Sequence, residues 1–473
     1  MRKFLIFHPF LFAIFPILSL FAYNIEEVPA ADLWLPISVA LAGTLILLLS
    51  LRLITKSGNK IAIIATSFLI LFFSYGHVRD AIFSPAAKTS FGANIFLASL
   101  WAVLFVVGTF FIIRSHRDFA TLTKFLNITA VVLVTISLIN VGIYEVRMGN
   151  LKHGEMNVAS SSPELSSTGY SPDIYYITLD MYAREDTLKE LFDYDNSEFT
   201  NHLTSRGFYV ATKSFSNYST TYLSLASSLS MDYPKQEDKD MPTLLEMIGN
   251  SKVSQFLKSR GYRYIFVGGG MEPKGIKSYA EVYSYRGVFG MGIGDFAQGL
   301  SDTTALSPFA RFFGGLYGAN SILYAFDALA EIPDIKEPTF VYAHIMSPHP
   351  PWFFDSDGPR EFKMFGPREG EMVSEGYLGN LIFISKKVET LIDEILSESS
   401  TPPIIILQGD HGLWWVEESY QHYEILNAYH LPEGGNRFLY ETISPVNSFR
   451  VIFNLYFDTD YDLLEDERPA LKN

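Results

Sequence analysis

Five apolar runs occupy the first third of the chain, and each is long enough, or nearly so, to cross a membrane as a helix. About 20 helical residues span the hydrocarbon layer of a bilayer. A single run would also fit a buried core helix, and the first could be a signal peptide, although no small-residue cleavage site precedes Glu26. Five in a row with short polar gaps predict a transmembrane domain over residues 1–144. The runs are Phe4–Ala22, Leu33–Leu51, Ile61–Gly76, Ala93–Ile113 and Phe125–Tyr144, of which the third is the shortest.

Basic residues are distributed unevenly around these runs. Lys and Arg concentrate in the short cytoplasmic loops of membrane proteins. The amino terminus and every second loop carry eight of them, whereas the alternate loops carry only Arg79 and Lys88. This asymmetry predicts a cytoplasmic amino terminus, and five spans then place the remaining chain outside; an even number would reverse this. The eight are Arg2, Lys3, Arg52, Lys56, Lys60, Arg114, Arg117 and Lys124.

Charge and composition separate the two parts of the chain and exclude several functions. Residues 1–150 carry 11 basic and 6 acidic groups, whereas the remainder has a net charge of −20. An acidic surface disfavours nucleic acid as a partner, and the absence of cysteine excludes disulfides and thiolate chemistry. The apolar runs hold few polar groups, which disfavours a transporter. His8 is a lone intramembrane histidine and weak evidence of function.

The pattern changes after a polar linker at residues 145–171. Short β-branched and aromatic runs at Asp173–Asp180, Tyr262–Val267, Thr339–Met346 and Ile404–Leu407 are typical of buried parallel strands. Helix-like segments separate them, so we expect an α/β domain over residues 172–473, with a mostly parallel sheet covered by helices on both faces. Ligands bind beyond the carboxyl ends of such strands. Residues 271–338 show no clear period and remain unassigned: they fit an insertion or a lid.

Acidic and imidazole side chains follow two of these strands. Asp180 ends the first, and Asp410 and His411 end the last in a glycine-flanked turn. Carboxylate oxygen and imidazole nitrogen are suitable ligands for zinc or manganese. The alternative is that Asp410 caps a turn and His411 is a surface residue.

A Ser/Thr-rich turn precedes a probable helix that begins near Tyr222. A helix N-terminus presents free N–H groups and a positive field, which favour a bound phosphate or sulfate. Thr221 is therefore the first candidate nucleophile, followed by Thr220 and then Ser219. An ordinary helix cap is the alternative, and it would be preferred if the turn were considered alone.

Two histidines flank a proline-rich turn at the end of the third strand. Pro348, Pro350 and Pro351 surround His349, so its ring has a restricted direction. A histidine near a metal can bind a substrate oxyanion or protonate a leaving group. His344 lies inside the apolar run, where a buried structural histidine is equally expected. His422 and His430 are weaker candidates.

The order of these motifs resembles the sulfatase-like branch of the alkaline phosphatase superfamily. The similarity is greatest to membrane-anchored members related to lipoteichoic acid synthases and phosphoethanolamine transferases, and it covers roughly Ser171 to Leu464. Four motifs in this order carry it, with ISPVNSFRVIFNLYF resembling the closing helix region. They are DIYYITLDMYARED, SNYSTTYLSLASSLSM, TFVYAHIMSPHPPWFFD and PPIIILQGDHG.

The resemblance implies roles for the candidate residues. By position, Asp180, Thr221, Asp410 and His411 would hold one divalent metal ion, with manganese or zinc preferred over magnesium or calcium. Thr221 would be the nucleophile. His349, aided by His344, would contact the substrate.

Two departures from the family pattern limit these roles. The chain has no C/S-x-P-S-R motif, which disfavours sulfate-ester hydrolysis through formylglycine. The next histidine after His411 is His422, eleven residues on, beyond Trp414 and Trp415. A full second set of metal ligands is not evident.

The sequence therefore predicts a membrane-anchored, metal-dependent hydrolase or phosphotransferase. Its expected partners are membrane lipids and a phosphoester that is lipid-linked or part of an envelope glycan, and it is expected at the cytoplasmic membrane with the catalytic domain outside. The alternatives are an inactive sulfatase-like scaffold in envelope assembly and a sulfuric ester hydrolase.

Overall fold

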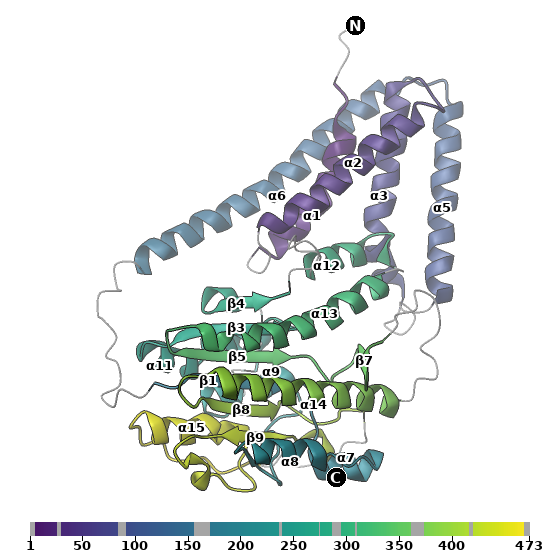
Figure 1. Ribbon diagram of the computed structural model, residues 1–473. Helices are drawn as coiled ribbons and strands as arrows, with labels where there is room; N and C mark the ends of the chain where they lie inside the picture. The colour runs from purple at the N-terminus through teal and green to yellow at the C-terminus, as the bar shows by residue number, and fades with distance from the viewer. Residues whose placement is uncertain are drawn as a thin grey trace. The chain divides into compact units, whose positions relative to one another are not determined.

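The computed structural model describes ten segments that form two compact units, shown in Figure 1. We call residues 1–160, 286–314 and 363–366 the helical unit. The remaining residues form the sheet unit. The described segments are residues 5–25, 30–83, 91–155, 171–235, 239–273, 275–285, 295–307, 310–360, 373–415 and 420–467.

The helical unit confirms the apolar amino-terminal domain. Within the described residues, α2, α3, α5 and α6 are long and apolar enough to cross a membrane. The first predicted run forms the shorter α1, whose 16 residues extend about 24 Å, less than the ~30 Å hydrocarbon layer. The bounds are α1 His8–Tyr23, a 3₁₀ turn Ala30–Leu33, α2 Trp34–Leu51, α3 Gly58–Ile82, α5 Phe91–Arg114 and α6 Ala120–Glu155.

The third run, which is the shortest in the sequence, becomes the central helix. Half of the apolar window of α3 is buried, against 6% of that of α5. Large apolar side chains on α5 and α6 are exposed, as expected for surfaces that face lipid. The basic segments meet at one end of the unit, because Lys60 at the start of α3 donates hydrogen bonds to the carbonyls of Ile113 and Ser115.

Side-chain hydrogen bonds fix the start of α1 inside the helical unit. Asn127 of α6 accepts hydrogen bonds from the N–H groups of Phe7 and His8 at 3.3 and 3.0 Å and donates to the carbonyl of Leu5. The His8 ring is hydrogen-bonded to Thr66 of α3 at 2.7 Å. Free N–H groups at a helix start are costly where water is absent, so Asn127 serves as the N-terminal cap that α1 does not supply itself.

This cap predicts that Asn127→Ala destabilises the helical unit by about 1–2 kcal/mol, because two amide groups lose their acceptor in apolar surroundings. Thermal unfolding of the full chain in detergent measures the effect. Asn140→Ala is the matched control, since Asn140 lies exposed on the same helix. Equal unfolding temperatures for the two variants would contradict the capping role.

The sheet unit confirms the predicted α/β architecture. The described strands form a seven-stranded sheet in the order β2-β9-β8-β1-β5-β3-β4, in which β9 is antiparallel to both of its neighbours, β2 and β8, and the other neighbouring pairs are parallel. A small separate hairpin pairs β6 with β7. The strands are β1 Ile174–Leu179, β2 Tyr209–Val210, β3 Arg263–Gly269, β4 Glu281–Ser284, β5 Thr339–Ile345, β6 Phe354–Asp355, β7 Gly358–Pro359, β8 Ile404–Gly409 and β9 Asn427–His430.

Helices cover both faces of the sheet (Figure 1). Successive strand residues point to opposite faces, and those of β1 join two separate cores: Tyr175 and Ile177 one, Ile174 and Tyr176 the other. The helices are α7 Glu185–Phe192, α8 Ser197–Ser205, α9 Thr221–Ser230, α10 Met241–Gly249, α11 Lys252–Ser259, α12 Asp295–Thr303, α13 Ala310–Ala330, α14 Val373–Glu398 and α15 Pro445–Tyr456, with 3₁₀ turns at Ile276–Ser278, Ile332–Asp334, Tyr420–His422 and Gly435–Phe438. Of these, α12 lies in the helical unit and α13 begins there.

Strand order positions the candidate site. The central strand β1 lies between β5 and β8, with Leu179 in register with Ile345 on one side and Gly409 on the other. Residues that follow these strands therefore emerge next to one another at the carboxyl edge of the sheet. Asp180 and Asp410, far apart in the sequence, become neighbours.

Candidate metal centre

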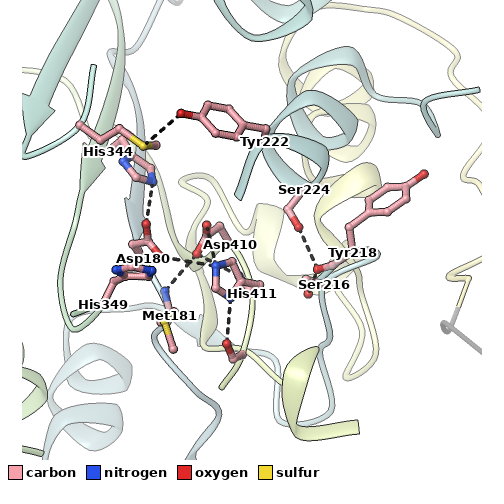
Figure 2. A network of polar contacts seen from close by, with 12 residues as sticks. Asp180, Met181, Ser216, Tyr218, Tyr222, Ser224, His344, His349, Asp410 and His411 are labelled. Atoms are coloured by element: carbon pink, nitrogen blue, oxygen red, sulfur yellow. Dashed lines mark hydrogen bonds and ion pairs between the residues drawn. The ribbon is translucent and has the colours of Figure 1, made fainter. Parts of the chain in front are cut away.

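Two carboxylates and one imidazole converge at this edge. Asp180, Asp410 and His411 are each at least 95% buried, and one potential ligand atom from each lies within 4.8 Å of the others. His411 Nε2 is 3.6 Å from Asp180 Oδ1 and 3.7 Å from Asp410 Oδ2 (Figure 2). The structure therefore brings together three of the four residues predicted to bind metal.

Backbone contacts hold these side chains in position. Asp410 Oδ1 accepts hydrogen bonds from the N–H groups of Met181 and His411 at 3.0 and 2.9 Å. Gly409 permits the close approach, because a Cβ there would lie 2.5 Å from the carbonyl oxygen of Tyr182. His411 Nδ1 lies 2.8 Å from the carbonyl of Gly412. A carbonyl only accepts, so Nδ1 carries a proton, and Nε2 faces the carboxylates.

A cation fits this arrangement. Asp180 Oδ1 and Asp410 Oδ2 are buried and accept no hydrogen bond of ordinary geometry from the described residues. They converge with His411 Nε2, and two buried carboxylate oxygens without a donor are costly unless a positive charge joins them. Separations of 3.6 and 3.7 Å leave room for an ion bonded to each atom at about 2.0–2.2 Å. Oxygen and nitrogen ligands suit zinc or manganese.

The electrostatics of the carboxylate pair agree with this fit. Burial, with the adjacent charge of Asp410, raises the pKa of Asp180 well above its usual range. Burial also raises the pKa of Asp410, but the neighbouring imidazoles of His411 and His344 and hydrogen bonding from Met181 outweigh it, so the net pKa lies below the usual range. Burial and the adjacent charge therefore oppose ionisation of Asp180, and a divalent ion would stabilise the ionised form of both carboxylates.

Thr221 is the first residue of α9 and lies beside this cluster. Its side chain approaches Asp410 closely enough to contribute to the lowered pKa of that carboxyl, although no ordinary hydrogen bond joins the two. Thr220 is the N-cap and is exposed, and its side chain caps no amide in the described part of the chain. Of the three hydroxyl candidates, Thr221 is the one whose contact with the cluster is evident.

The turn before α9 is tied to the metal-binding loop. The hydroxyls of Ser216 and Ser224 both donate to the carbonyl of Tyr218, at 2.7 and 2.9 Å (Figure 2). The Ser216 N–H donates to the carbonyl of Tyr423 at 2.7 Å, and the Gly412 N–H donates to the carbonyl of His422 at 2.8 Å. The segment 420–424 therefore connects the loop that carries Thr221 to the loop that carries His411.

The two histidines of the third predicted strand lie on either side of Asp180. His344 on β5 has no exposed surface, and its Nε2 is 3.6 Å from Asp180 Oδ2, the oxygen opposite that facing His411. Burial lowers the pKa of His344 to about 4, so it is neutral at pH 7. The His349 N–H donates to the carbonyl of Asp180 at 3.1 Å, and its ring lies 6.4 Å from that of His411.

The His349 ring has one nitrogen engaged. Its Nδ1 is hydrogen-bonded to the carbonyl of Pro350, so Nδ1 carries the proton and Nε2 is left for another partner. Burial lowers the pKa of His349. Of the weaker candidates, His422 contributes its backbone carbonyl, whereas His430 on β9 is hydrogen-bonded to the carbonyl of Pro403.

Sequence analysis missed an aromatic contact between the two histidine-bearing loops. Trp352, three residues after His349, packs at a ring distance of 6.1 Å on Trp415, four residues after His411. Tyr377 of α14 packs on the other side of Trp415 at 5.4 Å. The tryptophan pair after the Asp-His motif was the available signal, but only the fold shows its partner.

Comparisons with known proteins identify a family and several similar folds. The sequence model described as "Sulfatase" matches residues 176–438, more than half of the chain. No curated protein matches the sequence. Among solved structures, lipooligosaccharide phosphoethanolamine transferase A from Neisseria meningitidis is 13% identical over 94% of this chain and 95% of its own, with a TM-score of 0.42.

Two periplasmic domains are also similar. The C-terminal periplasmic domain of EptC from Escherichia coli is 11% identical over 63% of this chain and 86% of its own, with a TM-score of 0.41. The corresponding domain of phosphoethanolamine transferase EptC from Campylobacter jejuni is 12% identical over 63% and 92%, with a TM-score of 0.39. Likeness at this level does not transfer an activity.

The geometry predicts about one equivalent of divalent metal per chain, lost in Asp410→Asn, because the variant removes one ligand and its charge. Elemental analysis of the purified full chain, supplied with Zn²⁺ or Mn²⁺ and then dialysed, measures it. Asp393→Asn is the matched control, since Asp393 pairs with Arg206 at the surface. Equal metal content in both variants would overturn the site.

Proposed function

We propose that this chain, which belongs to the sulfatase family, is a membrane-anchored, metal-dependent enzyme that transfers or hydrolyses a phosphoester through Thr221. The observation that carries the proposal is the position of Thr221, at the start of α9 and beside Asp410 of the carboxylate cluster. The chain has no cysteine and no formylglycine-type motif, which disfavours formylglycine chemistry on a sulfate ester. Direct attack of a threonine hydroxyl on phosphorus requires neither feature.

The chain's own residues would bind, orient and transfer the group. A divalent ion held by Asp180, Asp410 and His411 would lower the pKa of the Thr221 hydroxyl and neutralise charge on the phosphoryl oxygens. Thr221 Oγ loses its proton and bonds to phosphorus as the bond to the leaving oxygen breaks. The free N–H groups at the start of α9 stabilise the non-bridging oxygens.

His349 and His344 have different roles in this proposal. His349, whose Nδ1 donates to the carbonyl of Pro350, has an unprotonated Nε2 that would accept the proton lost by Thr221 and pass it to the leaving oxygen. His344 supports the site through Asp180, because it has no exposed surface. Water or an acceptor alcohol then attacks phosphorus and releases Thr221. The choice between the two decides whether the enzyme is a hydrolase or a transferase.

The sheet unit is proposed to lie outside the cytoplasmic membrane. Lys60 marks the cytoplasmic end of α3 by the positive-inside rule. Ala305, which belongs to the part of the chain between β4 and α13, donates a hydrogen bond to Phe72 in the opposite half of α3. This argument depends on the direction of α3 alone and not on counting α1 as a span. An external site favours a lipid-linked or envelope-glycan substrate.

The nucleophile assignment predicts that Thr221→Ala lowers kcat on a chromogenic phosphodiester by about 10³-fold or more, because no other group forms the covalent intermediate. Thr220→Ala, the matched control, keeps at least about half of the activity, since Thr220 is exposed and caps nothing described. Wild-type turnover of a chromogenic sulfate ester, with none of the phosphodiester, would favour a sulfuric ester hydrolase instead.

The orientation predicts that a fluorescent protein that matures only in the cytoplasm stays dark when fused to the carboxy terminus. The same reporter fused after Ser57, in the basic loop before α3, fluoresces and serves as the control. Fluorescence from both fusions would place the sheet unit in the cytoplasm and contradict the proposed location.

A further inference from the structure

A short segment from the second half of the chain packs into the helical unit. Phe296 of α12 is 5% exposed and joins the core formed by α1 and α3, including Ile17, Phe21 and Phe73. Leu300, one helical turn later, packs against the same core. Sequence analysis had left this region unassigned. The apolar side of α12, formed by Phe296 and Leu300, packs on helices whose other surfaces face lipid or one another.

Backbone contacts join the segment to α3. The Ala305 N–H donates to the Phe72 carbonyl at 2.8 Å. Gly76 lies one turn further along α3, where a Cβ would stand 2.0 Å from the carbonyl oxygen of Asp302 and 2.6 Å from the Cα of Thr303. Only glycine permits this approach, so the contact is a fitted interface between two backbones.

The turn after α12 satisfies its own polar groups. The hydroxyls of Thr303 and Thr304 donate to the carbonyls of Leu300 and Ser301 at 2.8 and 2.9 Å. Thr304 Oγ1 also accepts from the Leu306 N–H at 3.1 Å. Thr304 is 2% exposed. Internal hydrogen bonding of this kind is required of backbone placed against membrane helices.

The connection between the docked segment and α13 is short, which limits the distance between them. Only residues 308–309 separate Ser307 from the start of α13, and three peptide steps reach at most about 11 Å. By contrast, residues 156–170 between α6 and the sheet unit reach up to about 55 Å. Of these two connections to the sheet unit, the one that follows the docked segment is therefore the shorter in sequence.

We propose that residues 295–307 are a docking element that attaches the sheet unit to the membrane helices a second time and restricts the site to substrates anchored in the same membrane. Restriction to a small volume raises the effective concentration of a membrane-bound substrate at the site without any new contact. The attachment stands on the contacts alone, whereas the substrate class rests on the proposed phosphoester chemistry.

Cysteine pairs test the attachment in the full chain in native membranes, because the chain has no cysteine of its own. Phe72→Cys with Ala305→Cys is expected to join through a short bifunctional thiol reagent. A protease site introduced within residues 156–170 then yields two fragments that remain linked. The control pair is Val103→Cys with Ala305→Cys, since Val103 lies exposed on α5. Linkage no greater than in the control pair would overturn the docking element.

Gly76→Ala tests the consequence for substrate. Its methyl group would collide with Asp302, whereas Gly108→Ala, the matched control on α5, meets no atom within 4 Å. We expect Gly76→Ala to reduce linkage of the Phe72–Ala305 pair several-fold and to reduce turnover of a phospholipid donor in vesicles about tenfold. Turnover of a soluble chromogenic phosphodiester stays unchanged, as do all three readouts in Gly108→Ala.

The outcomes separate the two proposals. Normal linkage in Gly76→Ala, or equal loss of turnover on both substrates, would contradict the docking role. Absence of wild-type turnover on both substrates, with normal linkage of the cysteine pair, would overturn the phosphoester chemistry and leave the attachment standing. Phe296→Ser, which removes the apolar contact without a collision, checks that the Gly76→Ala result is not a folding defect.

Discussion

Two buried carboxylates that face the same imidazole nitrogen are the interaction on which this site depends. Burial and mutual repulsion oppose ionisation of Asp180 beside Asp410, and a compensating cation would relieve both effects. The surrounding structure maintains this arrangement: Met181 and His411 supply N–H groups to one oxygen of Asp410, and Gly412 orients the imidazole. Polar groups are directed at the cluster from the backbone, which cannot reorient in the way a side chain can.

Much of this site was predictable because parallel strands end at a common edge. Apolar runs that end on Asp or Asp-His are visible in the sequence itself, and they predicted Asp180, Asp410 and His411 as site residues. Strand order was not readable: only the placement of β1 between β5 and β8 makes Asp180 and Asp410 neighbours. For His344 the sequence was compatible with both a substrate contact and a buried structural role. The pairing of β5 with β1 encloses its ring, which lies against Asp180.

In the helical unit, hydropathy predicted where helices lie better than where they end. The run Ile61–Gly76 looked shortest, but its helix continues to Ile82, because a helix persists through polar residues while its backbone stays hydrogen-bonded. Phe4–Ala22 looked sufficient, but the described residues before His8 are not helical. The docked segment escaped prediction for a different reason. Two apolar residues one turn apart on a nine-residue helix give too little pattern, and the requirement for Gly76 is visible only when Asp302 lies against it.

The docked segment and the site share a short stretch of chain. Helix α13 begins three residues after Ser307, and Gly318 within it packs so closely on the Phe353 ring that a Cβ would lie 2.3 Å away. Phe353 follows His349 by four residues. Two groups that pack this closely move together when either is displaced, because close-packed groups have few intermediate arrangements. The His349 loop, rather than the carboxylate pair on the central strands, is therefore the part of the site next to the residue that packs on α13.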